Sequence, residues 1–383
     1  MKILHVMAQL VLEHGGVVRA VTDLAEQSAA SGHDVAVASW NAPDAPEHWR
    51  TATGSPRLVE LTPPSKLGRF APDADAALRV EIDRADVVHL HTPWEPANRP
   101  IARLCRLVNT PYVLTIHGML DDWCMTQKGW KKRLYLGLGG RTLLEGAAFV
   151  HCTAQAELDQ SRVWYPKGTG TVAPLVFDIG PYTDLPGPEL ARETFNVDPA
   201  RPVVLFLSRL HVKKGVHVLV KAARHLAKTG VEAQTLIAGV GDETYTRALE
   251  AQIKSLGLTD RVRMLGMVKG ETKVSLYQAA DVFALPTSQE NFGFVLPEAL
   301  ACGTAAITTK GVDIWPELEG SGAATIAEQT PEAFAEAIAE LLVDEPRRTA
   351  MGAKGRDWVL RELDPAAVAK RYDSLYGDAI GRR

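Results

Sequence analysis

The repeated alternation of short β-branched runs with longer helical patterns constrains this chain most. Strand–helix–strand alternation produces parallel sheets whose two faces are covered by helices. The alternation lapses over residues 179–200, where proline and glycine cluster, and then restarts. A chain of 383 residues is also too long for one ordinary domain. We therefore predict an α/β protein with two Rossmann-like, doubly wound domains facing a central cleft.

The predicted domains comprise residues 1–185 and 195–363, with a C-terminal helix at 364–383 that packs back on the first domain. The expected strands are 3–7, 34–39, 87–90, 112–116 and 148–152, followed by 203–207, 234–238, 261–264, 282–285 and 305–308. The expected helices include 18–30, 97–107, 134–145, 332–343, 347–361 and 365–378. Ligands of such sheets bind outside the carboxyl ends of the strands.

Composition excludes several classes of protein. The formal net charge is −4, from 42 basic and 46 acidic residues, which argues against nucleic acid as the main partner. The four cysteines have no zinc-type spacing, so we expect reduced, mostly buried thiols and no metal. The first residues lack the apolar stretch of a signal peptide, and no run is long enough to cross a bilayer. We expect a cytoplasmic protein that could lie on a membrane surface.

The segment from Glu290 to Gly303 follows a predicted strand and carries the richest pattern. A helix is expected to begin near Phe294 and to end at Gly303. Unpaired N–H groups at a helix start favour a phosphate, and Gly293 lets the backbone approach a ligand. Glu290 and Glu298 place one carboxylate on each side of that start. The alternative is that Glu298 is a surface residue and Glu290 only complements the helix dipole.

Two cations follow the first strand of the second domain. Arg209 and Lys214 stand in a loop before Gly215 and the next helix. Arginine offers a forked donor and lysine a point charge, a pairing suited to a diphosphate. Taken alone, either residue could equally be a solvated surface charge.

Together these segments resemble the retaining glycosyltransferases of family 4, which have the two-domain type B glycosyltransferase fold. The resemblance rests on residues 209–215, 237–241, 261–266 and 290–303, and above all on two glutamates separated by seven residues. Two departures are Ser208, where the family often has glycine, and Leu175, where asparagine often follows the proline. The resemblance implies an enzyme that transfers a sugar from a UDP- or GDP-linked donor and needs no metal or other cofactor.

The resemblance also assigns roles to residues. Glu290 would contact the donor sugar, Glu298 the ribose, and Arg209 and Lys214 the diphosphate, so that Glu290, His117, Arg209 and Lys214 form the catalytic group. Other expected donor contacts are Gly16, Gly239, Gly241, Met267, Val268, Asn291, Phe292, Gly293, Phe294 and Val295.

Several first-domain residues are expected to bind the acceptor. Gly15 and Gly16 follow the first strand, and their sequence lacks the G-x-G-x-x-G of a dehydrogenase. His91 and His117 stand at the ends of strands and are predicted to face the cleft, whereas His89 is predicted to be structural. The expected acceptor contacts are Gly15, His91, Trp94 and Asp121. A structural role for the two strand-end histidines, and a plain turn at the glycines, remain alternatives.

Residues 127–136 mix lysine and arginine with Trp130 and Tyr135. Basic amphipathic helices that carry tryptophan bind anionic lipid surfaces, although a solvated helix face is the simpler alternative. This segment and residues 117–123 are similar to bacterial exopolysaccharide and lipid-linked oligosaccharide transferases. We therefore expect a glycan or lipid-linked acceptor. A nucleotide-sugar epimerase on the same fold and a non-catalytic nucleotide-sugar-binding protein remain alternatives.

Overall fold

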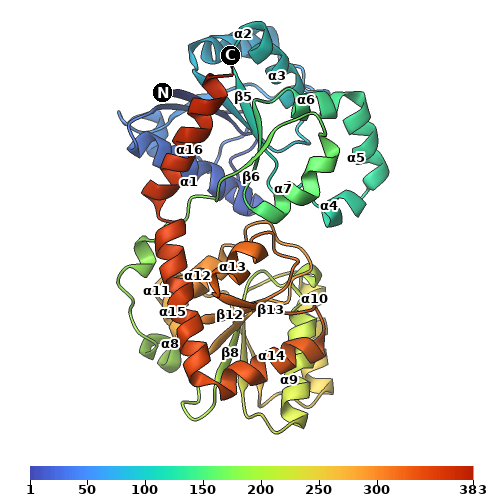
Figure 1. Cartoon of the computed structure of the whole chain (residues 1–383), viewed down its shortest axis with the longest axis vertical. Helices are drawn as coiled ribbons and strands as arrows, with labels where there is room; N and C mark the ends of the chain where they lie inside the picture. The colour runs from blue at the N-terminus through green and yellow to red at the C-terminus, as the bar shows by residue number, and fades with distance from the viewer. Residues whose placement is uncertain (383) are drawn as a thin grey trace. The chain divides into compact units, whose positions relative to one another are not determined.

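The computed structural model describes residues 1–382, which form two compact units (Figure 1). The first unit comprises Met1–Phe177 and the chain from Asp364 onward. The second comprises Asp178–Leu363, so the proline-rich segment at 179–200 belongs to it. No helix in the described part of the chain is both long enough and apolar enough to span a bilayer.

The first unit is built on a seven-stranded parallel sheet of order β3-β2-β1-β4-β5-β6-β7. Most of its strands are buried along their length, as expected when helices cover both faces of a sheet. Its strands are β1 (Lys2–Val6), β2 (Asp34–Ser39), β3 (Arg57–Glu60), β4 (Val87–His91), β5 (Tyr112–Thr115), β6 (Phe149–Cys152) and β7 (Gly170–Val172).

Helices flank this sheet, and apolar clusters fill the space between the layers (Figure 1). The last helix, α16, packs against β4 and β5 and against α1, although it follows the second unit in the chain. The helices are η1 (Leu12–His14), α1 (Gly16–Ala30), η2 (Glu47–Arg50), α2 (Pro72–Arg84), α3 (Asn98–Leu107), α4 (Asp122–Thr126), α5 (Gly129–Tyr135), η3 (Leu136–Gly140), α6 (Arg141–Glu145), α7 (Gln155–Ser161), η4 (Arg162–Trp164) and α16 (Pro365–Ile380).

The second unit is built on a six-stranded parallel sheet of order β10-β9-β8-β11-β12-β13. Its strands are β8 (Val203–Leu207), β9 (Gln234–Ala238), β10 (Val262–Gly266), β11 (Val282–Ala284), β12 (Ala305–Thr308) and β13 (Ala324–Ile326). Its helices are η5 (Gly180–Tyr182), α8 (Glu189–Thr194), η6 (Val212–Lys214), α9 (Val216–Lys228), α10 (Glu243–Ser255), α11 (Gly270–Gln278), α12 (Val295–Ala301), α13 (Trp315–Ser321), α14 (Pro331–Val343) and α15 (Glu345–Glu362).

The predicted fold class is confirmed in each unit, and all ten predicted strands are present within two residues of their expected ends. One predicted helix is wrong. The pattern at 134–145 is broken by Leu138 and Gly139, whose backbone angles are not helical, and Gly139 has a φ of 116°. A short helix therefore precedes residue 136 and another follows residue 140.

Strand order identifies one switch point in each sheet. In the first unit, the chain leaves β1 toward β2 on one side, while β4 lies on the other. In the second, β9 and β11 flank β8 in the same way. Loops that follow the two strands at a switch point diverge and leave a crevice between them. Residues 208–215 and 285–294 are those loops in the second unit.

Candidate functional site

Hydrogen bonds and close backbone packing join the loops that follow β8 and β11. The backbone N–H of Ser288 donates to the Lys213 carbonyl at 2.7 Å, and the hydroxyl groups of Thr287 and Ser288 donate to the same oxygen. Gly215 has a φ of 71°, and a Cβ atom there would lie 1.8 Å from the Pro286 carbonyl oxygen. Only glycine therefore lets the two loops approach this closely.

The side chain of Lys214 forms an ion pair with Glu290 in this crevice. Lys214 is 8% exposed, so the possibility that it is a solvated surface charge is wrong. Burial lowers the pKa of Lys214 to about 7, and the positive charges of Lys213 and Arg209 act in the same direction. The Glu290 carboxylate favours the charged form of the lysine. A second anion beside the ammonium group would favour that form further.

The backbone on both sides of Glu290 is held in place. Its N–H donates to the Gly311 carbonyl at 2.8 Å, and its own carbonyl accepts from the Asp313 N–H at 3.0 Å. The next residue, Asn291, donates from its side chain to the Asp313 carboxylate at 3.0 Å. The loop that follows β12 therefore positions the carboxylate that contacts Lys214.

Arg209 stands at the end of β8 and is exposed. Its guanidinium group has no hydrogen-bond or ion-pair partner among residues 1–382. Because its charge lowers the pKa of Lys214, the two cations act on one region of space. The crevice therefore presents one lysine that is paired with a carboxylate and one arginine that is available to a ligand.

Glu298 lies on α12 and is 4% exposed, so the possibility that it is a surface helix residue is wrong. Its two carboxylate oxygens accept hydrogen bonds from Lys273 at 2.8 Å and from the Tyr277 hydroxyl at 3.0 Å, both on α11. Burial raises the pKa of Tyr277 well above its ordinary value, so this phenol stays a donor. Sequence reasoning missed both partners, because nothing in residues 270–278 alone marks them.

The turn between the glutamates differs little from its predicted form. The helix begins at Val295, one residue after the expected start at Phe294. Phe292 is buried, and Gly293 has a φ of 65° with its backbone packed against the Glu290 side chain. Cys302 caps the end of α12, and Gly303 follows with a φ of 78°, as a helix-ending glycine should.

Four further donor candidates lie at the ends of β9 and β10. Gly239 and Gly241 lie beside the β8 loop, where a Cβ atom on either would approach a backbone oxygen to 1.9 Å. Leu210 forms a parallel bridge with Gly241 that extends the sheet contact. Met267 is 55% exposed and Val268 is buried, directly after β10. The structure thus places these four residues at the same edge of the second sheet.

In the first unit, the loop after β1 leads into α1 through Gly15 and Gly16. Gly15 has a φ of 100° and donates its N–H to the Leu12 carbonyl at 3.1 Å, while Gly16 is the exposed first residue of the helix. Trp94 follows β4 and donates its indole N–H to the Met119 carbonyl at 3.2 Å. These residues flank the switch point between β1 and β4.

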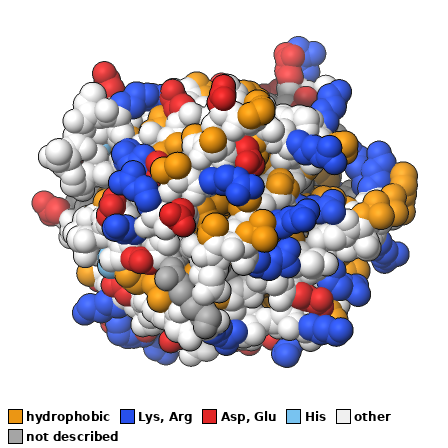
Figure 2. Space-filling model, turned by 90° about the horizontal axis from the view of Figure 1, so that it is seen from above, with side chains coloured by type: hydrophobic (Ala, Val, Ile, Leu, Met, Phe, Trp, Pro, Cys, Tyr) orange, Lys and Arg blue, Asp and Glu red, His pale blue; other side chains and the backbone are white. Residues whose placement is uncertain are grey.

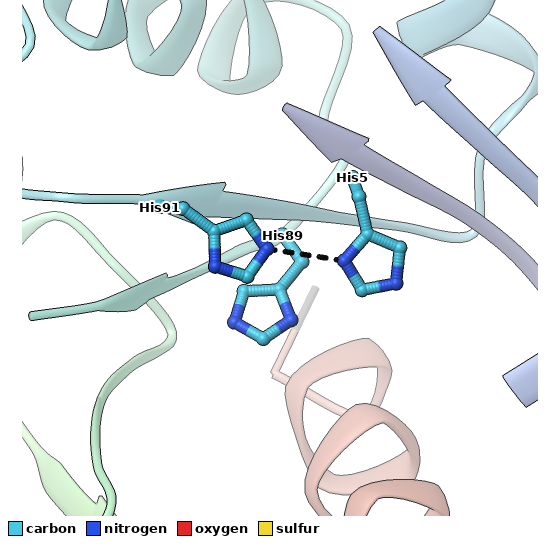
Figure 3. A group of neighbouring side chains, drawn as sticks. All are labelled: His5, His89 and His91. Carbon is cyan, nitrogen blue, oxygen red and sulfur yellow. Dashed lines mark hydrogen bonds between the residues drawn. The ribbon is translucent and has the colours of Figure 1, made fainter. Parts of the chain in front are cut away.

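A row of buried histidines crosses the same sheet. His5 and His89 are register partners on β1 and β4, and His91 lies two residues further on the same face (Figure 3). His5 shares a 3.2 Å hydrogen bond with His91, which shares one of 3.1 Å with His117. His91 and His117 are 2% and 8% exposed, so both are packed into the unit at the carboxyl end of the sheet.

A second row runs beside the first. His89 bonds the hydroxyl groups of Tyr376 and Thr115, and Thr115 bonds His151, as expected of a structural residue at position 89. Burial lowers the pKa of His5 and His117 to about 3 and that of His151 to about 4. Burial and the neighbouring histidines also hold the pKa values of His89 and His91 well below 6.5. All five are neutral at pH 7.

One nitrogen from each of His5, His89 and His91 lies within 4.8 Å of the others, a spacing that a metal ion could use. Both nitrogens of His89 and of His91 already bond to neighbours, as does Nδ1 of His5 (Figure 3). An ion at this place would have to break such bonds, and no carboxylate belongs to the group. These three histidines are therefore better suited to hydrogen bonding with one another as neutral rings than to holding a buried divalent cation.

The segment after β5 is held by buried carboxylates. Asp121 is 2% exposed and caps α4 by accepting from the Cys124 N–H at 2.5 Å. Glu157 is fully buried and accepts from the N–H groups of Gly118 and Thr153. These bonds explain how His117 maintains a φ of 50°, which is unusual for a residue with a side chain. Asp121 thus has a structural role, in addition to the acceptor contact that we predict for it.

Comparisons with known proteins place this chain among related sequences and structures. Residues 15–174 match the family described as glycosyl transferase 4-like domain, and residues 189–358 match glycosyl transferases group 1. A GDP-mannose-dependent alpha-(1-6)-phosphatidylinositol monomannoside mannosyltransferase of Mycobacterium tuberculosis is 28% identical over 369 residues, 90% of this chain and 89% of that protein.

A D-inositol 3-phosphate glycosyltransferase of Corynebacterium urealyticum is 36% identical over 169 residues, which cover 43% of this chain and 40% of that protein. The match therefore spans less than half the length of that relative. Among solved structures, Anabaena HepE in complex with UDP has a TM-score of 0.79 and 21% identity, covering 98% of this chain and 100% of that one, a likeness of fold alone. The two family matches follow one another along most of the chain, which therefore belongs to the glycosyl transferases, with a 4-like domain in its first half and a group 1 domain in its second.

Proposed function

We propose that this enzyme moves a sugar from a nucleoside diphosphate carrier to a glycan or lipid-linked acceptor. One observation carries the proposal: buried Lys214 pairs with Glu290 at the switch point of the second sheet, beside Arg209, whose guanidinium group has no partner in the described part of the chain. Two cations at such a crevice suit the diphosphate of a donor. The carboxylate beside them suits the hydroxyl groups of the attached sugar.

Donor binding would exchange the partner of Lys214. The diphosphate carries more negative charge than one carboxylate, so it would draw the ammonium group away from Glu290. The carboxylate would then be released toward the sugar. Glu298, held by Lys273 and Tyr277, would accept from the ribose hydroxyl groups. Backbone groups at 291–295, Gly16, Gly239 and Gly241 would contact the rest of the donor, with Met267 and Val268 along the base.

The chemical step is a substitution at the anomeric carbon. The bond from that carbon to the phosphate oxygen breaks, and a bond to the acceptor oxygen forms. Arg209 and Lys214 would stabilise the negative charge that develops on the leaving diphosphate. The acceptor proton would pass to the departing phosphate oxygen, and attack from the same side would retain the anomeric configuration. His117 would lie near the transferred sugar, while Gly15, His91, Trp94 and Asp121 would orient the acceptor.

The names of relatives support a UDP or GDP donor and a lipid-linked acceptor. The mycobacterial relative is named for GDP-mannose and for a phosphatidylinositol mannoside, and the HepE complex contains UDP. We propose a cytoplasmic enzyme of cell-surface polysaccharide synthesis that works at the inner face of the membrane. In residues 127–136, Trp130 and Leu134 are 67% and 53% exposed beside four cations, as expected of a surface that meets anionic lipid.

The decisive experiment incubates the purified protein with a panel of UDP- and GDP-sugars, with EDTA, and with or without a lipid-linked oligosaccharide extract. We expect release of the nucleoside diphosphate together with a glycosylated product, and anomeric retention by NMR. Glu290→Gln should remove transfer while the melting temperature stays close to that of the wild type. Conversion of the donor sugar without an acceptor would indicate an epimerase, and binding without any turnover would indicate a non-catalytic protein.

A further inference from the structure

A groove of about 570 Å³ on the first unit is lined by four arginines. Arg99, Arg103 and Arg106 come from α3, and Arg69 comes from the segment between β3 and α2. The spacing of the three helical arginines is i, i+4 and i+7, which places them on one face of the helix along about 10 Å. The residues that line the groove include no aspartate or glutamate.

These four guanidinium groups lack anionic partners. Each is exposed, and within residues 1–382 none forms a side-chain hydrogen bond or an ion pair. Some exposed arginines of the same unit are paired, such as Arg57 with Glu81 and Arg79 with Asp75, whereas Arg84 and Arg141 have no ion pair among the described residues. Four like charges that share one groove repel each other, so an anion placed among them is favoured.

Two glycines build the walls of the groove. Gly68 has a φ of 80°, and its backbone packs so closely on Pro96 that a Cβ atom would lie 2.4 Å from the Pro96 carbonyl. This contact brings Arg69 beside the start of α3. Gly139 forms the opposite wall, where a Cβ atom would lie 2.6 Å from a guanidinium nitrogen of Arg99. The kink that interrupts the predicted 134–145 helix therefore leaves room for an arginine head group.

Large apolar side chains surround the groove on the outside. Leu67, which lines it, is 79% exposed, and Leu138, next to Gly139, is 63% exposed. Trp130 and Leu134 on α5 are exposed as well. Figure 2 shows hydrophobic side chains bordered by Lys and Arg at the edge of this unit where α5 lies in Figure 1. Exposed leucines would contribute nothing to the binding of a small soluble anion, whereas they would gain apolar contacts in a lipid surface.

We propose that the Arg69–Arg99–Arg103–Arg106 groove binds the phosphate groups of anionic lipid head groups while Leu67 and Leu138 enter the lipid surface. Arginine is suited to this task because its fork matches the oxygens of a phosphate. The inference rests on the membrane-facing part of the proposed function and names the residues that recognise the lipid. It assigns this recognition to α3 and its neighbours, separately from the cations at 128–133.

The test compares binding of the full-length protein to vesicles of phosphatidylcholine with and without phosphatidylglycerol. Removing a cation that lies near an anionic surface weakens binding about fivefold. The double variant Arg69→Gln, Arg103→Gln should therefore bind the anionic vesicles about 25-fold more weakly. The control Lys228→Gln, Lys254→Gln makes the same change in net charge at exposed lysines of the second unit and should stay within about twofold of the wild type.

Three results would overturn the inference: equal binding to both kinds of vesicle, an unchanged affinity of the arginine variant, or equal losses in both variants. Inorganic pyrophosphate is the soluble probe. A melting shift with pyrophosphate that disappears in the arginine variant, without vesicle binding by the wild type, would make the groove a site for free anions and would also overturn the inference. UDP and GDP shifts on the same proteins test the donor site separately, because the arginine variant should retain them.

Discussion

The Lys214 ammonium group contacts the Glu290 carboxylate across the crevice between the loops that follow β8 and β11. Both groups sit where the strand order of the second sheet reverses, so the fold brings them together over 76 residues of sequence. The Glu290 carboxylate favours the charged form of this lysine, whereas burial favours its neutral form. A bound diphosphate would replace Glu290 as the anionic partner of Lys214, and the Glu290 carboxylate would become available to the sugar.

Protonation of Lys214 should couple to donor binding. Burial lowers its pKa to about 7, so above that pH a fraction of the ligand-free protein carries a neutral amine. Because the diphosphate binds the charged form, we predict proton uptake on binding of UDP or GDP at pH 8, and an affinity that falls as pH rises from 7 to 9. Calorimetry in two buffers of different ionisation enthalpy measures the uptake. Lys214→Arg should bind without it, and uptake by that variant would contradict the assignment.

Removing either hydrogen-bond partner of Glu298 should destabilise the second unit, and the loss should be larger for Lys273 than for Tyr277. Lys273→Ala leaves a buried carboxylate without its cation, and we expect a loss of about 2–4 kcal/mol in the free energy of unfolding. Tyr277→Phe removes one hydrogen bond and should cost about 1–2 kcal/mol. Lys269→Ala, at an exposed lysine before α11, is the matched control and should change little. Urea unfolding gives all three values, and equal effects of the two lysine variants would refute the role of Lys273.

Two glycines with similar backbone angles should respond differently to alanine. Gly215 and Gly230 have φ values of 71° and 81°, but only at Gly215 would a Cβ atom collide with another backbone, that of Pro286. Gly230→Ala should cost about 1 kcal/mol for its backbone angle alone. Gly215→Ala should cost several times more and should weaken nucleoside diphosphate binding, because it separates the two loops. Thermal unfolding and ligand titration measure both effects, and matching losses would show that the loops are not closely packed.

The buried histidines should make the first unit sensitive to acid. Their pKa values in the folded protein lie below 6.5, the ordinary value that they regain on unfolding. As pH falls below 6.5, the histidines of the unfolded chain bind protons, whereas the same histidines stay neutral in the folded chain. Each histidine then costs about 1.4 kcal/mol of stability per pH unit. Hydrogen exchange at pH 7.5 and 5.5 should show β1, β4 and β6 losing protection before β8 and β9, and uniform behaviour of both sheets would contradict this.

The sequence predicts the two parallel sheets well because buried parallel strands appear as continuous apolar runs, such as Val203–Leu207. It misses β3, β7 and β13, which are three or four residues long and lie at the edges of the sheets. The cations and glutamates of the second unit stand out in the sequence because they cluster next to strand ends. The histidine row was only partly found, since the pairing of His5 with His91 depends on the register of β1 against β4.

The Lys273 and Tyr277 contacts escaped prediction for a related reason. They depend on how α11 packs against α12, and a short helix with mixed composition carries little information about which of its faces meets a neighbour. The arginine groove likewise depends on two glycine-mediated contacts, at Gly68 and Gly139, that join segments far apart in the chain. Local pattern therefore identifies the strand-end chemistry, whereas tertiary packing decides which side chains support it.

The measurement that tests the donor site most directly is calorimetric titration of UDP and GDP into the wild type, Lys214→Ala and Lys213→Ala. Lys213 is the matched control because it is an adjacent cation whose side chain donates to Gln289 at 3.1 Å. We predict that Lys214→Ala weakens the preferred nucleoside diphosphate by about 10- to 100-fold, as expected for a lost charged hydrogen bond, while Lys213→Ala changes it by less than about threefold. Equal affinity of the wild type and Lys214→Ala would place the diphosphate elsewhere and contradict the proposed site.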